Sequence, residues 1–348
     1  MAYTTINKST DYFNTKLYTG NGSTQSITGV GHQPDLVWVK QRNGTAYHQL
    51  TDACRGVNSQ AASNDTGLGA SNACVTAFNS DGFALGSNGD VNGNTLTYAS
   101  WNWKANGQGS SNTDGTINST YTSASTTSGF SIVSYTGNGT SGATVGHGLG
   151  VIPQVIIVKR LNATDQTIMY HHKLNATPQD YYIRISDTGA ASDFAGMWND
   201  TAPTSSLFSI GNSPTTNANS EAMIAYCFAE KQGFSKFGSY IGNGNADGTF
   251  IYTGFKPAWI MTRAIDIGGG TDWYVFDNKR PAYNLTNLEL QPNNSGIESS
   301  DIQLDILSNG FKPRGSQGGH NGSGKNYIYM AYAEEPLVST NGTPATAR

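Results

Sequence analysis

The chain has 348 residues, and its composition excludes several classes of protein. Charged residues make up 13% of the chain, against a usual share of about 25%. The formal net charge of −4 provides no basic surface that could offset phosphates, so we expect no nucleic-acid partner. The longest apolar runs fall short of the roughly 18 residues that a membrane-spanning helix needs, so we expect no membrane insertion.

The remaining composition predicts an all-β protein with few or no helices. Glycine contributes 42 residues and aromatic residues make up 11% of the chain, enough for packed cores. Gly, Asn, Ser and Thr favour turns over helices, whereas the apolar residues occur in short β-branched or aromatic runs that favour strands. Cys54, Cys74 and Cys227 are too few and too scattered for a disulfide scaffold or a zinc site.

A short motif, Tyr-(Thr/Ile)-Gly-Asn-Gly, occurs three times along the chain, starting at Tyr18, Tyr135 and Tyr240. After each copy come a proline that we expect to open a buried strand, a later Phe step, an Asn-led turn and an aromatic closing strand. The prolines are Pro34, Pro153 and Pro257, the turns begin at Asn92, Asn217 and Asn321, and the closing strands span 97–105, 222–230 and 326–334.

This shared order predicts three tandem repeats of about 100 residues, each a β-sandwich or jelly-roll-like module. A single fold with the three units packed around a common axis explains the same pattern, and the sequence does not separate the two. The predicted parts are an N-terminal arm (1–16), the repeats 17–105, 129–232 and 233–335, a Gly/Ser/Thr-rich linker or exposed hairpin (106–128) and a C-terminal tail (336–348). We expect the arm and the tail to fold only on a partner, or not at all.

Three blocks of sequence resemble a repeated domain of uncharacterised function found in structural proteins of tailed, especially marine, bacteriophages. They are MAYTTINKSTDYFNTKLYTGNG, FSIVSYTGNGTSGATVGHGLGVIPQVIIVK, and SNGFKPR followed by NYIYMAYAE. The resemblance covers residues 12–335 and carries no catalytic residues with it. It implies a virion component assembled in the host cytoplasm, either a tail fibre or tail-associated appendage or, alternatively, a capsid decoration or head-fibre protein.

The N-terminal arm is the segment that we expect to dock on other virion proteins. It precedes the first repeat and carries four large side chains to bury, namely Tyr3, Ile6, Tyr12 and Phe13. Because fibres are often trimers and oligomers are usually symmetric, we also expect a homo-oligomer, with a trimer favoured.

Recognition of a host-surface polysaccharide is the functional hypothesis that the residues themselves favour. Sugar sites combine aromatic faces with Asn, Asp and Gly amides on exposed loops. Most of the six tryptophans lie in predicted strands, whereas Trp198 lies in a loop-like stretch and is followed by Asn199 and Asp200. These three residues are the candidate ligand-binding site.

Metal and catalytic chemistry find little support in the sequence. The pattern Asn-x-Asp-Gly occurs at Asp114 and Asp247, where a structural calcium ion is an alternative to two simple Asx turns. We expect no cofactor beyond that ion. Other carboxylates also sit in turn patterns, so we expect no enzyme, with a polysaccharide depolymerase as the alternative. The recurring histidines His32, His147, His48 and His171 are expected to bond turns or backbone carbonyls.

Overall fold

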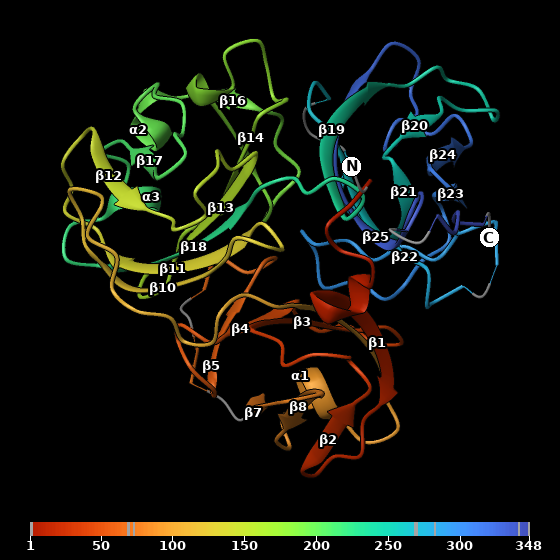
Figure 1. Cartoon of the computed structure of the whole chain (residues 1–348), viewed down its shortest axis with the longest axis horizontal. Coiled ribbons are helices and arrows are strands. Elements are labelled where there is room, and N and C mark those ends of the chain that lie inside the picture. The colour runs from red at the N-terminus through yellow and green to blue at the C-terminus, as the bar shows by residue number, and fades with distance from the viewer. Residues whose placement is uncertain are drawn as a thin grey trace.

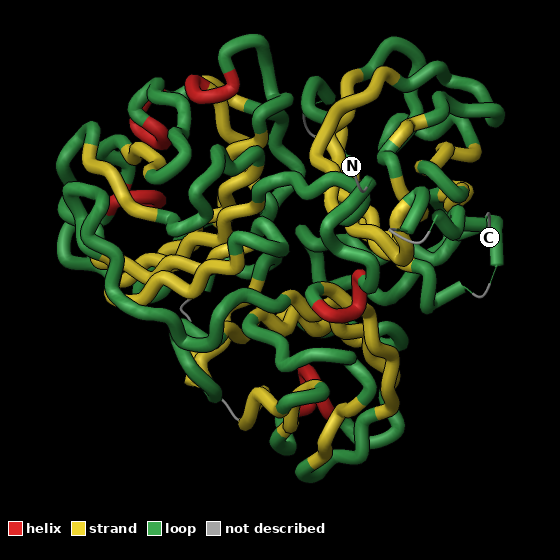
Figure 2. The backbone as a smooth tube through the Cα atoms, in the orientation of Figure 1, coloured by secondary structure: helices red, strands yellow, loops and turns green. Residues whose placement is uncertain are grey.

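The computed structural model describes residues 3–67, 70–71, 74–267, 271–281, 283–339 and 342–346. The chain forms three lobes around a common centre (Figure 1). Strands dominate the regular structure, and the described helices are single turns (Figure 2). The prediction of an all-β fold with few helices is therefore confirmed. Within the described part of the chain, no helix has the length and apolar character needed to cross a membrane.

The first lobe pairs a six-stranded sheet, ordered β1-β9-β3-β4-β5-β6, with a small sheet ordered β2-β8-β7. Apolar side chains from both sheets, including Val37 and Phe83, fill the space between them. The large sheet comprises β1 (Phe13–Thr19), β9 (Thr97–Trp103), β3 (Leu36–Gln41), β4 (Gln49–Asp52), β5 (Ser59–Ala62) and β6 (Ala70–Ser71). The small sheet comprises β2 (Gln25–Thr28), β8 (Gly82–Leu85) and β7 (Val75–Asn79).

The second lobe has a seven-stranded sheet ordered β10-β11-β18-β13-β14-β15-β16 and a two-stranded sheet, β12-β17. The large sheet comprises β10 (Ser119–Ser125), β11 (Phe130–Thr136), β18 (Ala222–Phe228), β13 (Val155–Arg160), β14 (Thr167–His171), β15 (Tyr181–Arg184) and β16 (Ser192–Asp193). The small sheet comprises β12 (Ala143–Gly146) and β17 (Leu207–Ile210).

The strand β10 lies within the segment 106–128, which was predicted to be a linker or an exposed hairpin, and it pairs antiparallel with β11. The backbones of Ser and Thr residues can form the hydrogen bonds of an edge strand, but their side chains lack the apolar pattern on which strand prediction depends. A polar strand at a sheet edge is therefore hard to distinguish from a linker by composition alone.

The third lobe has a four-stranded sheet ordered β19-β25-β21-β22 and a small sheet ordered β20-β24-β23. Pro257 was predicted to open a strand, and this is wrong. It lies within β21, where the register with β25 shifts. Such an irregularity tolerates the missing N–H. The strands are β19 (Ser235–Ile241), β25 (Asn326–Pro336), β21 (Phe255–Ala264), β22 (Tyr274–Asp277), β20 (Ile251–Tyr252), β24 (Gly310–Arg314) and β23 (Gln303–Leu307).

The described helices lie in the loops of the lobes. Asn88 caps α1 by accepting a hydrogen bond from the backbone N–H of Asp90 at 2.8 Å, and Ser213 caps α3 in the same way through Thr215. The helices are α1 (Gly89–Asn92), α2 (Ala195–Trp198), α3 (Pro214–Asn217) and the two 3₁₀ turns η1 (Ser9–Asp11) and η2 (Pro178–Asp180).

The three large sheets share one strand order and one register. The runs β1-β9-β3-β4, β11-β18-β13-β14 and β19-β25-β21-β22 are antiparallel throughout. In the first lobe, Trp103 of the central strand pairs with Phe13 on one side and Leu36 on the other. In the second lobe, Phe228 pairs in the same way with Phe130 and Val155. In the third lobe, Tyr332 pairs with Ser235 and Trp259. Residues that match in this register occupy corresponding positions in the three lobes.

One face of each large sheet contributes to a single central core. Trp103 and Trp259, from the first and third lobes, meet edge to face with ring centroids 5.6 Å apart. Trp103 also contacts Phe130 of the second lobe, with centroids 6.5 Å apart. The lobes therefore share a central core in addition to the apolar core inside each lobe.

The recurring sequence motif forms the same turn in each lobe. The motif tyrosines donate hydrogen bonds from their hydroxyls to backbone carbonyls near the Asn-led turns: Tyr18 to Val91 at 2.7 Å, Tyr135 to Thr216 at 2.7 Å and Tyr240 to His320 at 2.8 Å. A Cβ on the first motif glycine would lie 2.3 Å from a carbonyl oxygen in all three cases, which are Gly20, Gly137 and Gly242. The second motif glycines, Gly22, Gly139 and Gly244, have φ near +70°, +67° and +66°.

A buried asparagine fastens each of these turns. Asn92, Asn217 and Asn321 are fully buried, and each side-chain oxygen accepts the N–H of the motif asparagine. Each amide nitrogen then donates to carbonyls on both sides, for example from Asn217 to Gly211 at 2.8 Å. The asparagines of the predicted Asn-led turns therefore hold the turns in place through buried hydrogen bonds inside the lobes.

Buried cations join each lobe to another lobe. Lys40, Lys159 and Arg263 occupy corresponding positions in β3, β13 and β21 and are at most 3% exposed. Burial lowers the pKa of both lysines to about 8. Each cation donates to carbonyls of a loop from a different lobe: Lys40 to Ser295 at 3.2 Å, Lys159 to Asp65 at 2.8 Å, and Arg263 to Asp187 and Gly189 at 2.8 Å each.

A second set of contacts runs around the three lobes in the opposite direction. Asp52, His171 and Asp277 occupy corresponding positions at the ends of β4, β14 and β22 and are all fully buried. Asp52 of the first lobe accepts from Tyr226 of the second at 2.9 Å, His171 of the second contacts the Tyr329 carbonyl of the third at 3.2 Å, and Asp277 of the third accepts from Trp101 of the first at 3.1 Å. The junctions thus close into a ring.

Candidate functional site

The tryptophan predicted to bind glycans is part of the interior. Trp198 ends α2 and is 2% exposed, with its Nε1 donating to the Tyr181 carbonyl at 3.1 Å. Asn199 caps the helix in a left-handed conformation and accepts from the Ser141 hydroxyl, while Asp200 is exposed. The predicted site is therefore wrong for Trp198. A single helical turn leaves no periodic pattern, so the stretch resembles a loop in the sequence.

The two aspartates considered for calcium are held by other groups. The backbone N–H of Asp114 donates to Asn112 Oδ1 at 2.9 Å, which is an Asx turn. Asp247 forms the same turn with Asn245, and its carboxylate pairs with Lys312 and Arg314 at 2.5 and 2.7 Å. These cations lower the pKa of Asp247. The described residues contain no cluster of three or more His, Cys, Asp or Glu side chains suited to a metal.

The N-terminal arm packs against its own chain. Ile6 and Phe13 are buried in the central core, and the Tyr3 hydroxyl donates to the Gly254 carbonyl at 2.6 Å. Tyr12 is half-buried against Phe234, with ring centroids 6.1 Å apart. The docking prediction is therefore wrong for Ile6 and Phe13, whose side chains are already buried, and residues 13–16 belong to β1. The pattern of apolar side chains in the arm does not show whether they pack against the same chain or against a partner.

The C-terminal tail is also ordered where it is described. β25 extends to Pro336, and Val338 then bridges Pro344. The predicted parts at 1–2, 340–341 and 347–348 lie outside the described residues.

The recurring histidines and the cysteines have structural surroundings. His32, His147 and His171 each contact a backbone carbonyl through a ring nitrogen, as expected from their positions. His48 differs from them, because its Nδ1 accepts a hydrogen bond from Trp38 Nε1 at 2.9 Å. Cys54, Cys74 and Cys227 are buried and free, and burial raises the pKa of each thiol.

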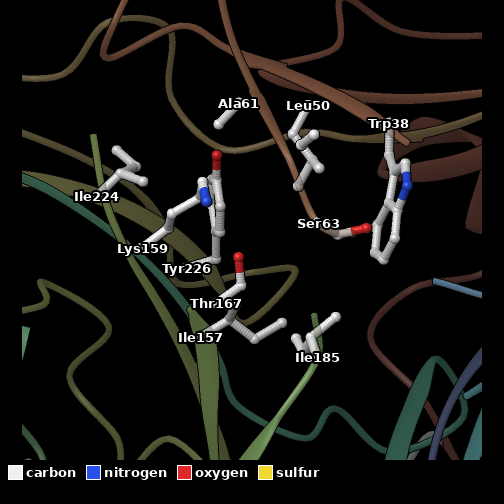
Figure 3. Close-up of a pocket in the computed structure, with 11 residues that line it drawn as sticks. Trp38, Leu50, Ala61, Ser63, Ile157, Lys159, Thr167, Ile185, Ile224 and Tyr226 are labelled. Atoms are coloured by element: carbon white, nitrogen blue, oxygen red, sulfur yellow. The ribbon is translucent and has the colours of Figure 1, made fainter. Parts of the chain in front are cut away.

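An enclosed cavity lies between the first and second lobes (Figure 3). Trp38, Leu50 and Ala61 line it from one side, and Ile157 and Tyr226 line it from the other. Its volume of about 20 Å³ leaves room for about one water molecule, and its walls are mostly apolar. It is a packing defect at a junction and is too small for a ligand.

An open groove of about 480 Å³ between the second and third lobes is a better candidate; we call it the inter-lobe groove. Its floor is apolar and its rim is polar. The floor residues are Leu174, Tyr181, Ala190, Ala191 and Ile265, and the rim residues are Lys173, Asn175, Ser239, Asp266 and Asn326.

The secondary structure explains how this groove is held open. Lys173 and Asn175 follow β14, Asp266 follows β21, and Asn326 begins β25, so strand ends position the polar rim. The backbone N–H of Ala191 donates to the Ile265 carbonyl at 3.1 Å, which ties the two walls together. The groove is therefore formed by fixed elements of two lobes that lie side by side (Figure 1).

Hydrogen bonds join Asp266 and Asn326 on the polar rim. Asp266 accepts from both the backbone N–H and the side-chain Nδ2 of Asn326, the latter at 2.9 Å. Both residues are exposed, and they leave carboxylate lone pairs and an amide oxygen available to hydroxyl groups. Tyr181 offers a half-buried aromatic ring in the same groove. Such a combination suits a polyhydroxylated ligand with apolar faces.

Comparison with family models gives one assignment. Residues 8–336 match the model of a domain of unknown function, DUF7483. The chain belongs to this family. Comparisons with curated proteins and with solved structures give no match. The family model spans all three lobes, so its match treats them as one domain.

The sequence analysis predicted a site at Trp198 and did not predict the inter-lobe groove. Asp266 and Asn326 are 60 residues apart in the chain, and Tyr181 lies in another lobe. Asn326 opens the predicted closing strand 326–334, but no motif links it to Asp266 or Tyr181. The only available signal was the recurrence of strand ends in the three units, which places corresponding loops near one another once the units pack around an axis.

Proposed function

We propose that the chain is a structural protein of a bacteriophage particle, a tail fibre or tail-associated appendage, that binds a host-surface polysaccharide. The likeness of its repeated blocks to phage structural domains supports the placement in a particle. The inter-lobe groove, with its apolar floor and the Asp266–Asn326 pair, supports the binding role and carries this part of the proposal. The proposal assigns no catalysis to the chain.

The proposal includes an origin of the three lobes as copies of one β-sandwich unit. Shared strand order, shared register and the matching tyrosine hydroxyl contacts of Tyr18, Tyr135 and Tyr240 support this. The closed ring of junctions suits an external module, because a shared core and buried polar contacts resist separation of the lobes. Other virion proteins and further copies of the chain, as a trimer, are the proposed partners.

Location in the particle is tested on purified phage that carries the chain. Mass spectrometry of the particle should detect the protein, and cryo-electron microscopy should place its density at the tail in three or six copies. Density over the capsid lattice would instead support a decoration protein, and absence from the purified particle would contradict both. Light scattering of the isolated chain tests the trimer.

Glycan binding is tested with arrays of bacterial surface polysaccharides. We expect binding by the wild-type chain and at least a tenfold loss in Asp266→Ala and in Tyr181→Ala. Asp301→Ala is the matched control, because Asp301 is also an exposed aspartate but lies outside the groove. Equal losses in Asp266→Ala and Asp301→Ala, or no binding by the wild type across host polysaccharides, would contradict the binding role.

A further inference from the structure

The outer edge of β1 is an unpaired strand edge in the first lobe. The residues before and after β1 bond to the β9 side, through Lys104 N–H to Tyr12 O at 2.9 Å and Gly20 N–H to Leu96 O at 2.8 Å. In an antiparallel ladder the backbone groups alternate in direction, so those of Phe13, Thr15 and Leu17 point away from β9. Among the described residues, no strand pairs with this edge.

The corresponding edge of the second lobe is covered by the chain's own β10. Phe130 and Ile132 of β11, which correspond to Phe13 and Thr15, pair with Ser125 and Ser123 of β10. The covering strand reads Ser-Thr-Tyr-Thr-Ser-Ala-Ser and runs antiparallel. The fold therefore contains, at this very position, an example of the strand that the edge accepts.

The third lobe covers the same position with side chains. The N–H of Phe237 in β19 donates to Glu230 Oε1 at 2.8 Å, and its carbonyl lies 2.7 Å from His172 Nε2. Glu230 stands two residues after Phe228, at the end of β18 in the second lobe. The third lobe packs on β1 through Tyr332 and Phe13, and its residue that corresponds to Glu230 is Glu334, whose carboxylate pairs with Lys256 at 3.1 Å instead of capping the β1 edge.

A groove of about 350 Å³ runs beside the β1 edge; we call it the β1 groove. Asn14, Thr15, Lys16 and Leu17 of β1 line it, together with Gly29 and, from the third lobe, Lys279. Thr15 is 3% exposed, and its buried hydroxyl has no hydrogen-bond partner among the described residues. A buried hydroxyl without a partner is costly, and an incoming strand would provide one.

We propose that the β1 edge is a docking site for one extended, Ser/Thr-rich strand of another polypeptide, which pairs antiparallel with β1 as β10 pairs with β11. The strand's backbone bonds to Thr15 and Leu17, and Lys16 and Lys279 at the rim of the groove bind its carbonyl oxygens. Main-chain hydrogen bonds between the two strands provide the affinity. The site therefore binds an extended polar segment and does not require a long sequence motif. The inference is independent of glycan binding at the inter-lobe groove.

The test uses the full chain and a synthetic peptide with the sequence of residues 117–127, which contains β10. Amide hydrogen exchange should slow at least tenfold at Thr15 and Leu17 when the peptide is added. A peptide N-methylated at the residue matching Ser123, which pairs with Ile132, should give no protection because its ladder is interrupted. No protection at millimolar peptide, or equal protection by both peptides, would overturn the proposal.

A protein variant provides the second arm. Leu17→Pro removes an N–H that points away from β9, and edge strands tolerate proline there, so the variant should unfold at a urea concentration near that of the wild type. It should nevertheless lose the peptide-dependent protection of Thr15. Retained protection in Leu17→Pro contradicts strand pairing. A peptide-free dimer that Leu17→Pro abolishes would assign the edge to a second copy of the chain and also overturn the proposal.

Discussion

Trp101 and Asp277 are 176 residues apart in the chain, yet the indole Nε1 of Trp101 donates to Asp277 Oδ2 at 3.1 Å. The Arg280 guanidinium pairs with the same carboxylate at 2.7 Å and lies 5.9 Å from the centre of the Trp101 ring. Burial alone raises the pKa of Asp277, but Arg280 and Trp101 outweigh it, so the pKa falls below its usual value. One buried carboxylate thus joins the third lobe to the first.

Replacing this carboxylate should destabilise the whole ring. Asp277→Ala leaves the fully buried Arg280 without its main partner, and we expect the free energy of unfolding to fall by about 3–5 kcal/mol. Urea unfolding measures the loss. The control is Asp11→Ala, which breaks the exposed pair with Lys8 and should cost less than about 1 kcal/mol. Similar losses in the two variants would contradict a structural role for the Asp277 junction.

The first glycine of the repeated motif should not tolerate a side chain. In Gly20→Ala the new Cβ would lie 2.3 Å from the Gly93 carbonyl oxygen, so the turn must shift. We expect a loss of about 1–3 kcal/mol in the free energy of unfolding. Gly89→Ala is the matched control, because its Cβ meets nothing within 4 Å and it lies in α1. A neutral Gly20→Ala would show that the turn is not tightly constrained.

Stability should fall as the pH drops below neutrality. Burial lowers the pKa of all six histidines, that of His171 to about 3 and that of His320 to about 4. Between those values and about 6.5 the unfolded chain binds more protons than the folded chain, so stability is lost as pH falls through this window. At pH 5 each deeply buried histidine should cost about 2 kcal/mol relative to pH 7.

Urea unfolding at pH 7 and pH 5 checks this prediction. Asp35 and Glu289, whose pKa values burial raises, act in the opposite direction and reduce the net loss. His320→Gln removes one titrating group and should shrink the difference between the two pH values by about 2 kcal/mol. An unchanged difference would mean that His320 is protonated in the folded protein.

Trp198 should matter for stability and not for recognition. Trp198→Ala removes a buried ring that contacts Tyr170, with centroids 6.0 Å apart, and we expect a loss of about 3–5 kcal/mol. Polysaccharide binding per folded molecule should stay at the wild-type level, measured on the same arrays after the folded fraction is determined. Loss of binding without loss of stability would restore the site predicted from the sequence.

Much of the fold could be read from local sequence patterns. Short β-branched and aromatic runs predicted strands such as β3 and β13, and the recurrence of the motif at Tyr18, Tyr135 and Tyr240 marked three similar turns. These features depend on neighbouring residues, so the chain order reveals them. The strand β10 escaped prediction because its Ser and Thr side chains lack an apolar pattern, and its pairing with β11 is what makes it a strand.

The sequence by itself determined the all-β class, the turn residues and the three matching series of landmarks, because backbone preferences and side-chain periodicity act over a few residues. Only the tertiary structure decided which side chains meet. It buried Trp198 and Phe13, brought Asp266 to Asn326 at the groove, and set Asp277 against Trp101. Such contacts follow from packing three sheets around one core, which joins residues that no local pattern relates.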